Sequence, residues 1–218
     1  MPIPSRDLLC LDCKKGISLL QGPMCTRCGR PFVSPTGPDH LCKTCIESPP
    51  PFQVARSIFL FDHTIRDLLH RLKYSGDTYA AKALVWLARQ ELKGLGPYLW
   101  PFEGLILPVP MFKDRLRKRG FNQALVLASG IFDRKDVSPW LLVKTRSTPS
   151  QTGLSLQERR RNVKGAFTAH VDGIKGKDIL IFDDVFTTGA TVTAAAMAVK
   201  RAGAKKVLVL TLARTPEP

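Results

Sequence analysis

The sequence has no long apolar run. None of its apolar stretches approaches the ~18 residues that a membrane-spanning helix needs. The first residues, MPIPSRDLLCLDC, lack the apolar centre of a secretory signal peptide. The chain also contains no internal repeat and no low-complexity tract. We therefore expect a cytoplasmic protein without membrane insertion.

Acidic residues are scarce relative to basic ones. The chain carries 33 Lys and Arg against 18 Asp and Glu, which gives a net charge of +15 and a pI of about 9.9. This excess favours partners that carry phosphate groups. Charge alone does not distinguish nucleic acid from nucleotides or sugar diphosphates. With 218 residues and 44% hydrophobic content, the chain can bury one main core and a small appendage.

Cysteine is absent beyond residue 45. The six cysteines form three Cys-x-x-Cys pairs near the N-terminus. In a reducing compartment, two such pairs place four thiolates around one Zn²⁺ ion, whereas disulfides are disfavoured because no export signal is present. The sequence therefore predicts a structural zinc site in an N-terminal zinc ribbon.

Six cysteines exceed the four ligands of one tetrahedral zinc. The second pair is followed by Gly29, which favours the tight turn around a thiolate, and the third pair closes the site after a polar loop. His40 is a weaker candidate, because a lone histidine is usually a surface residue. The predicted ligands are Cys25, Cys28, Cys42 and Cys45, and the alternates, which are otherwise a free dithiol, are Cys10 and Cys13.

A proline-rich segment, SPPPF at residues 48–52, follows the cysteines. Consecutive prolines stiffen the backbone and donate no hydrogen bonds, as expected of a linker. We predict a zinc ribbon at residues 1–50, with this linker at its end, and a main domain at residues 51–218.

The main domain alternates between strand and helix patterns. Apolar runs typical of strands occur at residues 54–61, 104–110, 140–143, 165–168, 179–182 and 206–212. Helical spacing of apolar residues occurs at residues 65–72, 78–92, 124–132 and 192–199. This order predicts an α/β fold, with a mostly parallel sheet and helices on both faces.

The stretch ILIFDDVFTTGAT at residues 179–191 is the most informative in the chain. It runs from a buried strand through Asp183 and Asp184 into a small-residue loop and a helix start, a place where amide N–H groups bind anions. Two carboxylates there would repel bare phosphate, so we expect a ligand with hydroxyls or bound Mg²⁺, as a sugar phosphate offers. An ordinary strand end with acidic residues is the alternative. The predicted loop contacts are Thr187, Thr188, Gly189, Ala190 and Thr191.

Two segments concentrate the positive charge. Residues 113–119, KDRLRKR, carry five cations directly after a predicted strand, at the edge where open α/β sheets bind ligands. Residues 144–164 form a long polar segment with six cations against one acid, which is typical of a mobile or functional loop. We expect both segments to face one site and to bind a diphosphate. The candidate contacts are Lys113, Arg115, Arg119, Arg146 and Gln151.

Several short motifs together resemble the ComF family of competence proteins. The resemblance covers nearly the whole chain and rests on residues 25–31, 108–110, 119–123, 151–154, 159–162 and 183–191. It implies a zinc ribbon joined to a type I phosphoribosyltransferase domain. It further implies that 5-phosphoribosyl 1-diphosphate binds with Asp183 and Asp184 on the ribose hydroxyls and with residues 187–191 on the 5-phosphate.

The resemblance leaves two functions open. One is binding, and possible transfer, of the phosphoribosyl group in a Mg²⁺-assisted reaction linked to DNA uptake. The other is a non-enzymatic adaptor that binds single-stranded DNA and other competence proteins. The sequence is also similar to the phosphoribosyl half of glutamine amidophosphoribosyltransferase, at residues 108–110 and in the segment from Arg146. It lacks the amidotransferase half, so the acceptor is undefined.

Overall fold

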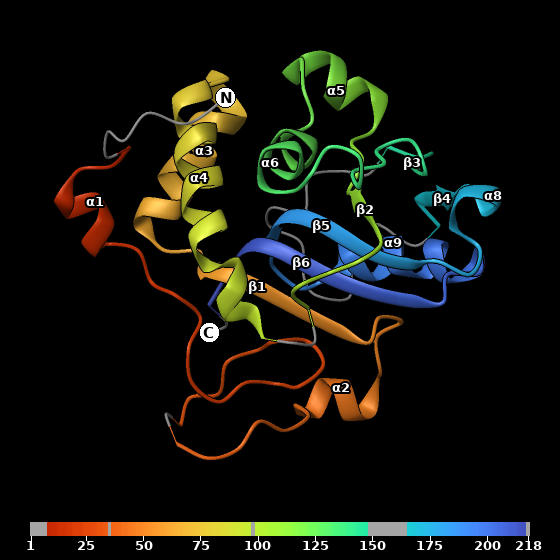
Figure 1. Ribbon diagram of the computed structural model, residues 1–218, viewed down its shortest axis with the longest axis horizontal. Helices are drawn as coiled ribbons and strands as arrows, with labels where there is room; N and C mark the ends of the chain where they lie inside the picture. Colours follow the sequence, from red (N-terminus) through yellow and green to blue (C-terminus); the bar gives the residue numbers. More distant parts are fainter. Residues whose placement is uncertain (1–7, 35, 97–98, 148–164, 217–218) are drawn as a thin grey trace.

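The computed structural model describes residues 8–34, 36–96, 99–147 and 165–216. Its main sheet has four parallel strands in the order β1-β6-β5-β2 (Figure 1). The predicted α/β fold with a parallel sheet is therefore confirmed. The strands are β1 (Val54–Leu60), β2 (Leu105–Pro108), β5 (Asp178–Phe186) and β6 (Lys206–Arg214).

Helices cover both faces of this sheet, as the alternating pattern predicts. Side chains of β5 point alternately to the two faces, so Leu180 and Phe182 join one apolar cluster while Ile179 and Ile181 join the other. Most helical side chains of the first cluster come from three helices, and most of those of the second come from one. The three are α3 (His63–Ser75), α4 (Thr78–Glu91) and α6 (Gln123–Ile131), and the one is α9 (Ala190–Arg201).

The strands predicted at residues 140–143 and 165–168 do not join the main sheet. They form β3 (Leu142–Lys144) and β4 (Phe167–Ala169), which pair with each other in antiparallel fashion and pack against α9. Only three residues of each strand are paired. Leu142 and Phe167 are buried in the apolar cluster that contains α9. Their side chains therefore belong to the core, although β3 and β4 do not extend the main sheet.

The four-cysteine part of the zinc ribbon lies against the main sheet on the face that carries α9, whereas Leu8, Leu9, Ile17 and Leu19 pack against the cluster of the other face. The ribbon contains the short helices α1 (Leu11–Lys15) and α2 (Lys43–Glu47). Four of its cysteines share an apolar cluster with Phe52, at the end of the proline-rich segment, and with Ala55 of β1. The backbone N–H of Ala55 donates to the carbonyl of Arg27 at 2.6 Å. Ribbon and sheet therefore share one core.

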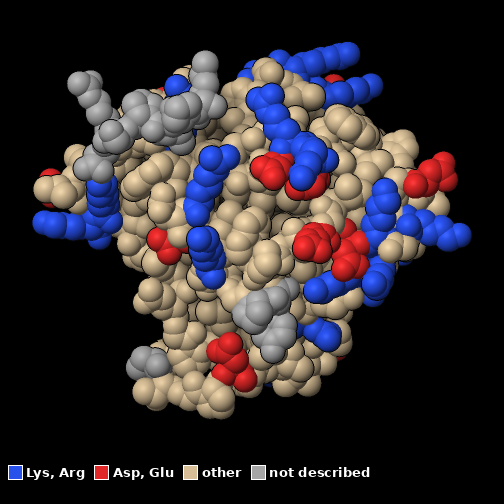
Figure 2. All heavy atoms as spheres, in the orientation of Figure 1, with Lys and Arg blue, Asp and Glu red and all other residues tan. Residues whose placement is uncertain are grey.

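The remaining elements are short and lie around the sheet. The basic run at residues 113–119 forms helix α5 (Lys113–Arg119), which ends at Gly120 with a φ of 83°. Figure 2 shows Lys and Arg side chains projecting at the top of the molecule, over α5. Two further elements are η1 (Leu92–Leu95) and α8 (Val171–Ile174). In the described part of the chain, no helix has the length and apolar character to cross a membrane.

Candidate functional site

Four thiols of the ribbon form a compact metal-binding cluster. The sulfur atoms of Cys25, Cys28, Cys42 and Cys45 all lie within 4.8 Å of one another. The Cys28 and Cys42 sulfurs are 3.8 Å apart. A tetrahedral zinc with Zn–S bonds of ~2.3 Å places its sulfurs about 3.8 Å apart, so the cluster fits Zn²⁺. The structure brings together the four predicted ligands.

The surroundings of these thiols also favour a bound cation. Burial opposes ionisation of Cys25, but hydrogen bonds from nearby backbone N–H groups outweigh burial and lower its pKa to about 6. Burial raises the pKa of Cys28 to about 11 and raises that of Cys45 further. A bound Zn²⁺ would favour the thiolate form of all four cysteines.

The local backbone explains why a glycine follows Cys28 in the zinc site. Gly29 has a φ of 67°, and a Cβ atom there would lie 2.6 Å from the carbonyl oxygen of Ala55. Only glycine allows both this backbone angle and this close approach of the ribbon to β1. Cys10 and Cys13 lie at α1, outside the four-thiol cluster.

The two acids of the sequence signature lie within β5, not after it. The strand extends to Phe186 because β6 continues beside it, pairing Asp183 with Thr211 and Phe186 with Arg214. Asp183 and Asp184 are only 8% and 6% exposed. They are therefore buried at the edge where the parallel strands end, which we call the carboxyl edge.

A lysine from α3 completes this acid pair. The ammonium of Lys73 forms an ion pair with a carboxylate oxygen of Asp184. The other Asp184 oxygen accepts the Val185 N–H, and Asp183 accepts the Asp184 N–H, both at 2.9 Å. Sequence reasoning did not find Lys73, because only the fold brings α3 to the end of β5.

The two acids differ in their readiness to ionise. Burial, reinforced by the neighbouring Asp184 carboxylate, raises the pKa of Asp183 well above its ordinary value. Burial also opposes ionisation of Asp184, but the Lys73 ammonium outweighs it and lowers the Asp184 pKa. The pair therefore favours a single negative charge, held on Asp184.

This asymmetry predicts opposite effects of the two neutralising substitutions on stability. Asp183→Asn should raise the free energy of unfolding at pH 8 by roughly 0.5–2 kcal/mol, because it removes a group whose ionisation disfavours the fold. Asp184→Asn should lower it by about 1–3 kcal/mol, because Lys73 loses its partner. Urea unfolding at several pH values measures both.

The pH dependence follows from the directions of the two pKa shifts. The pKa of Asp183 is higher in the folded than in the unfolded protein, where it is ~3.9, so Asp183 lowers the stability of the fold as the pH rises above that value. The gain in stability from Asp183→Asn should therefore shrink toward pH 4. A depressed folded pKa stabilises the fold above the unfolded value and loses that contribution as pH falls. The loss from Asp184→Asn should therefore also shrink toward low pH. Changes of the same sign for both variants at pH 8 would contradict this assignment.

The loop after β5, residues 187–191, leads directly into α9, and we call it the Thr-rich loop. Gly189 precedes the helix with a φ of 74°, and a Cβ atom there would lie 2.5 Å from the ring of Phe186. The hydroxyl oxygen of Thr188 accepts the Ala190 N–H at 3.4 Å. The N-terminal end of a twelve-residue helix thus lies next to the acid pair, as predicted.

Positive charges of both basic segments act on Lys144, the last residue of β3. Burial lowers the pKa of Lys144, as do the positive charges of Arg115 and Arg146, while the Asp183 carboxylate acts in the opposite direction. The charges of Arg115 of α5, Arg146 of the long polar segment and Asp183 therefore all act on this one lysine. Lys144 is a second residue that sequence reasoning did not single out.

The other predicted contacts of the basic segments are placed differently. Arg119 lies over the Tyr74 ring, 5.4 Å from its centroid, and donates to the Gln123 side chain at 2.9 Å. It therefore contacts α3 and α6. Lys113 is the exposed first residue of α5. Gln151 lies outside the described residues, as does most of the predicted polar loop.

Comparisons with known proteins match both parts of the chain. The family described as "Double zinc ribbon domain" matches residues 2–48, and the family described as "Phosphoribosyl transferase domain" matches residues 122–218. Two four-cysteine sites would require eight cysteines, whereas this chain has six. Only one complete four-cysteine site is therefore available, and Cys10 and Cys13 lie outside it.

Curated relatives match over most of the length of the chain. "DNA utilization protein YhgH" of Salmonella typhi is 33% identical over 201 residues, covering 88% of this chain and 84% of the relative. "Competence protein F" of Haemophilus influenzae is 24% identical over 222 residues, covering 94% and 96%. Among solved structures, the glutamine phosphoribosylpyrophosphate (PRPP) amidotransferase from B. subtilis matches with a TM-score of 0.37 and 20% identity, over 60% of this chain and 25% of that one.

Proposed function

Since the chain belongs to the ComF family, which joins a double zinc ribbon to a phosphoribosyltransferase domain, we propose that it binds 5-phosphoribosyl 1-diphosphate. The observation that carries this proposal is the buried acid pair directly beside the Thr-rich loop and the start of α9. Such a site combines acceptors for sugar hydroxyls with donors for phosphate. We also propose that the boundary between the zinc ribbon and the phosphoribosyltransferase-like domain lies at residue 50.

The proposed contacts divide the ligand into three parts. The Thr-rich loop and the first N–H groups of α9 hold the 5-phosphate, and Asp183 with Asp184 holds the ribose hydroxyls. Arg115 and Arg146 hold the diphosphate, because their charges act on Lys144 together with that of Asp183. Lys113 and Gln151 remain proposed contacts, whereas Arg119 would first have to leave Tyr74 and Gln123.

Lys73 limits where Mg²⁺ can bind. Its ammonium already lies against Asp184, where a metal ion would compete with it. We therefore assign Mg²⁺ to the diphosphate oxygens, with Asp183 as its nearest protein carboxylate, directly or through water. Binding of a cation there would also favour ionisation of Asp183.

Transfer of the phosphoribosyl group would depend mainly on electrostatics. The bond from the sugar to the diphosphate breaks through an oxocarbenium-like state, so negative charge grows on the departing diphosphate. Arg115 and Arg146 are placed to stabilise that charge. Asp184, the acid that favours ionisation, lies on the sugar side.

Calorimetric titration tests the binding proposal. Zinc-loaded protein should bind one 5-phosphoribosyl 1-diphosphate per chain, and Mg²⁺ should strengthen the binding because it neutralises part of the diphosphate charge. Ribose 5-phosphate is the matched control, since it lacks the diphosphate and should bind more weakly. No measurable heat with the sugar diphosphate in the presence or absence of Mg²⁺ would reject the proposal.

A single-stranded DNA adaptor is the second candidate function. The names of the relatives refer to DNA utilization and competence, and α5 presents five cations on an exposed helix. In this role, other competence proteins would be further partners. The two functions share Lys113 and Arg115 of α5, whereas the acid pair serves only the phosphoribosyl site.

DNA binding through α5 should be electrostatic and independent of base sequence. Neutralising Arg115, Arg117, Lys118 and Arg119 together removes four candidate phosphate contacts. The slope of log affinity against log salt should then fall in magnitude by about 2–3, since each contact on a single strand contributes ~0.7. Fluorescence anisotropy with a labelled oligonucleotide at several salt concentrations measures this slope.

A matched control removes the same charge elsewhere. Lys175, Lys177, Lys200 and Arg201 are exposed and lie outside α5. Their neutralisation should change the slope much less. An unchanged slope in the α5 variant would show that this helix is not the DNA contact surface.

A further inference from the structure

Two hollows lie between the zinc ribbon and the main sheet. The outer hollow, of about 500 Å³, is lined by ribbon residues that include Phe32 and His40. The inner hollow, of about 330 Å³, lies between the proline-rich segment and the first turns of α9. Arg30 and Arg214 line both hollows, which therefore adjoin. Neither Asp183 nor Asp184 lines either of them.

The outer hollow is positively charged beyond what the zinc site requires. A zinc ion with four thiolates carries a net charge of −2. Two guanidinium groups offset it, because Arg214 donates to the Cys28 carbonyl at 2.9 Å and Arg56 donates to the Cys25 carbonyl at 3.4 Å. Arg30 and Lys43 then add positive charge, of which the Glu47 carboxylate, 3.8 Å from the exposed Lys43 ammonium, offsets a part. None of the described residues that line this hollow is acidic.

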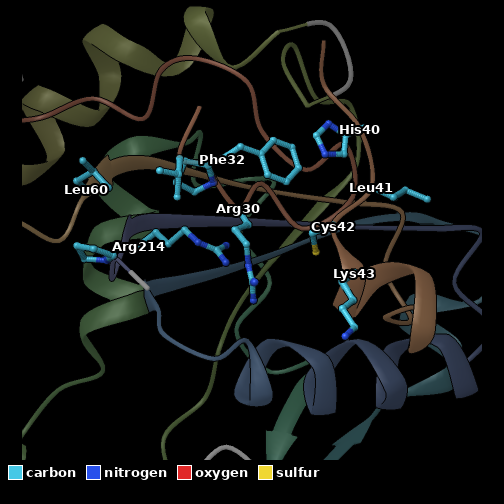
Figure 3. Close-up of a pocket in the computed structure, with 11 residues that line it drawn as sticks. Arg30, Phe32, His40, Leu41, Cys42, Lys43, Leu60 and Arg214 are labelled. Atoms are coloured by element: carbon cyan, nitrogen blue, oxygen red, sulfur yellow. The ribbon is translucent and has the colours of Figure 1, made fainter. Parts of the chain in front are cut away.

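An aromatic stack lies at the same hollow. The rings of Phe32 and His40 are parallel within 5°, with their centroids 3.9 Å apart, and His40 is exposed. A planar ligand ring can therefore extend this stack. Figure 3 shows the two rings together, while the side chains of Arg30 and Lys43 point toward α9. Apolar and cationic contacts are thus separated within one hollow.

We propose that the outer hollow binds a nucleoside phosphate, either as a free nucleotide or as one unit of a single strand. The base stacks on the Phe32–His40 pair, and the phosphate lies against Arg30 and Lys43. An inorganic anion would contact only the cations, and a base without phosphate would contact only the aromatic pair. A nucleotide can contact both, because its sugar holds the base and the phosphate apart. Arg214 is buried and over the Phe186 ring, so it supports the floor of the hollow.

The test compares four probes on the zinc-loaded full chain. These are adenosine monophosphate, an eight-nucleotide oligodeoxyadenylate, adenosine and inorganic phosphate. Arg30→Gln with Lys43→Gln should weaken binding of both phosphorylated nucleosides by at least tenfold. Phe32→Leu with His40→Ser should weaken it by about 5- to 100-fold while leaving inorganic phosphate binding unchanged. Lys82→Gln, on the exposed side of α4, is the charge control.

The outcomes separate the two sources of the ligand. Tighter binding of the oligonucleotide than of the monophosphate, lost in both double variants, assigns the site to a strand, and equal binding assigns it to a free nucleotide. Zinc content and thermal unfolding of each variant identify a misfolded protein. The proposal is overturned if zinc-loaded protein binds no nucleoside phosphate, or if both folded double variants bind it as the wild type does.

This site is independent of the proposed phosphoribosyl site, whereas its strand ligand would deepen the second function, DNA binding. Asp183→Asn should leave binding at the outer hollow unchanged, and the two hollow variants should bind 5-phosphoribosyl 1-diphosphate like the wild type. Failure of one site is therefore distinguishable from failure of the other. Oligonucleotide binding that depends on α5 and not on Phe32 or Arg30 would exclude a strand as the ligand of the outer hollow.

Discussion

Removal of zinc is expected to loosen both the ribbon and the sheet edge beneath it. The protein should contain one zinc per chain in a reducing, chelator-free preparation. Cys25→Ser and Cys42→Ser should each lose the metal and lower the free energy of unfolding by ~4 kcal/mol or more, as loss of a structural metal does. The thiol cluster is buried with Phe52 and Ala55, so its loss exposes part of the sheet core.

Hydrogen exchange should locate this loosening. In the zinc-free protein we expect lost protection in residues 8–50 and at β1, where the Ala55 N–H donates to Arg27. The far face of the sheet, covered by α3, α4 and α6, should stay protected, because none of the four cysteines belongs to its cluster. Equal loss of protection in all parts of the chain would contradict this prediction, because it would mean that the ribbon and the whole sheet unfold together.

The control variants are Cys10→Ser and Cys13→Ser. Both residues lie outside the four-thiol cluster, so these variants should keep one zinc and nearly the full stability. Full metal content in Cys25→Ser, or two zinc ions per chain in the wild type, would contradict the ligand assignment. The first result would favour Cys10 and Cys13 as ligands.

Arg214 connects the zinc site to the Thr-rich loop. Its guanidinium donates to the Cys28 carbonyl at 2.9 Å and lies over the Phe186 ring, 4.4 Å from the centroid. The Phe186 ring in turn fills the space beneath Gly189. Zinc-free protein should therefore also hold the Thr-rich loop less firmly, although no cysteine lies near the acid pair in sequence.

Local signals explain which parts of the site the sequence predicted. The zinc ligands are paired at fixed spacing, and Gly29 marks the turn that they require. The acid pair, the Thr-rich loop and the start of α9 are contiguous in the chain, so their proximity follows from connectivity. The parallel sheet followed from the alternation of strand and helix patterns, because such connections are right-handed and regular.

Contacts between distant segments could not be predicted in the same way. Lys73 resembles any basic residue in the last turn of a helix until α3 is placed at the carboxyl edge. The extension of β5 through the acids depends on pairing with β6, which no local pattern reveals. Phe32 and His40 form a stack only because two ribbon segments meet, so His40 seemed only a weak metal ligand in the sequence.

The acid pair should discriminate between a sugar diphosphate and a bare anion. Asp183→Asn with Asp184→Asn should weaken 5-phosphoribosyl 1-diphosphate binding about a hundredfold, and at least tenfold. The double substitution removes the charged acceptor Asp184, worth ~1.5–3 kcal/mol in a hydrogen bond to a ribose hydroxyl, and the acceptor Asp183, worth ~0.5–1.5 kcal/mol when it is neutral. Calorimetry with the sugar diphosphate and with inorganic phosphate measures the two affinities on the same protein.

Inorganic phosphate should respond in the opposite direction. The Thr-rich loop and the start of α9 hold an anion without the acids, and the substitutions release Lys73 from its ion pair with Asp184. Phosphate affinity should therefore stay unchanged or rise. Equal losses for both ligands would indicate a folding defect, which urea unfolding would reveal. Unchanged binding of the sugar diphosphate would mean that the acids are ordinary strand-end residues, and the phosphoribosyl proposal would then be wrong.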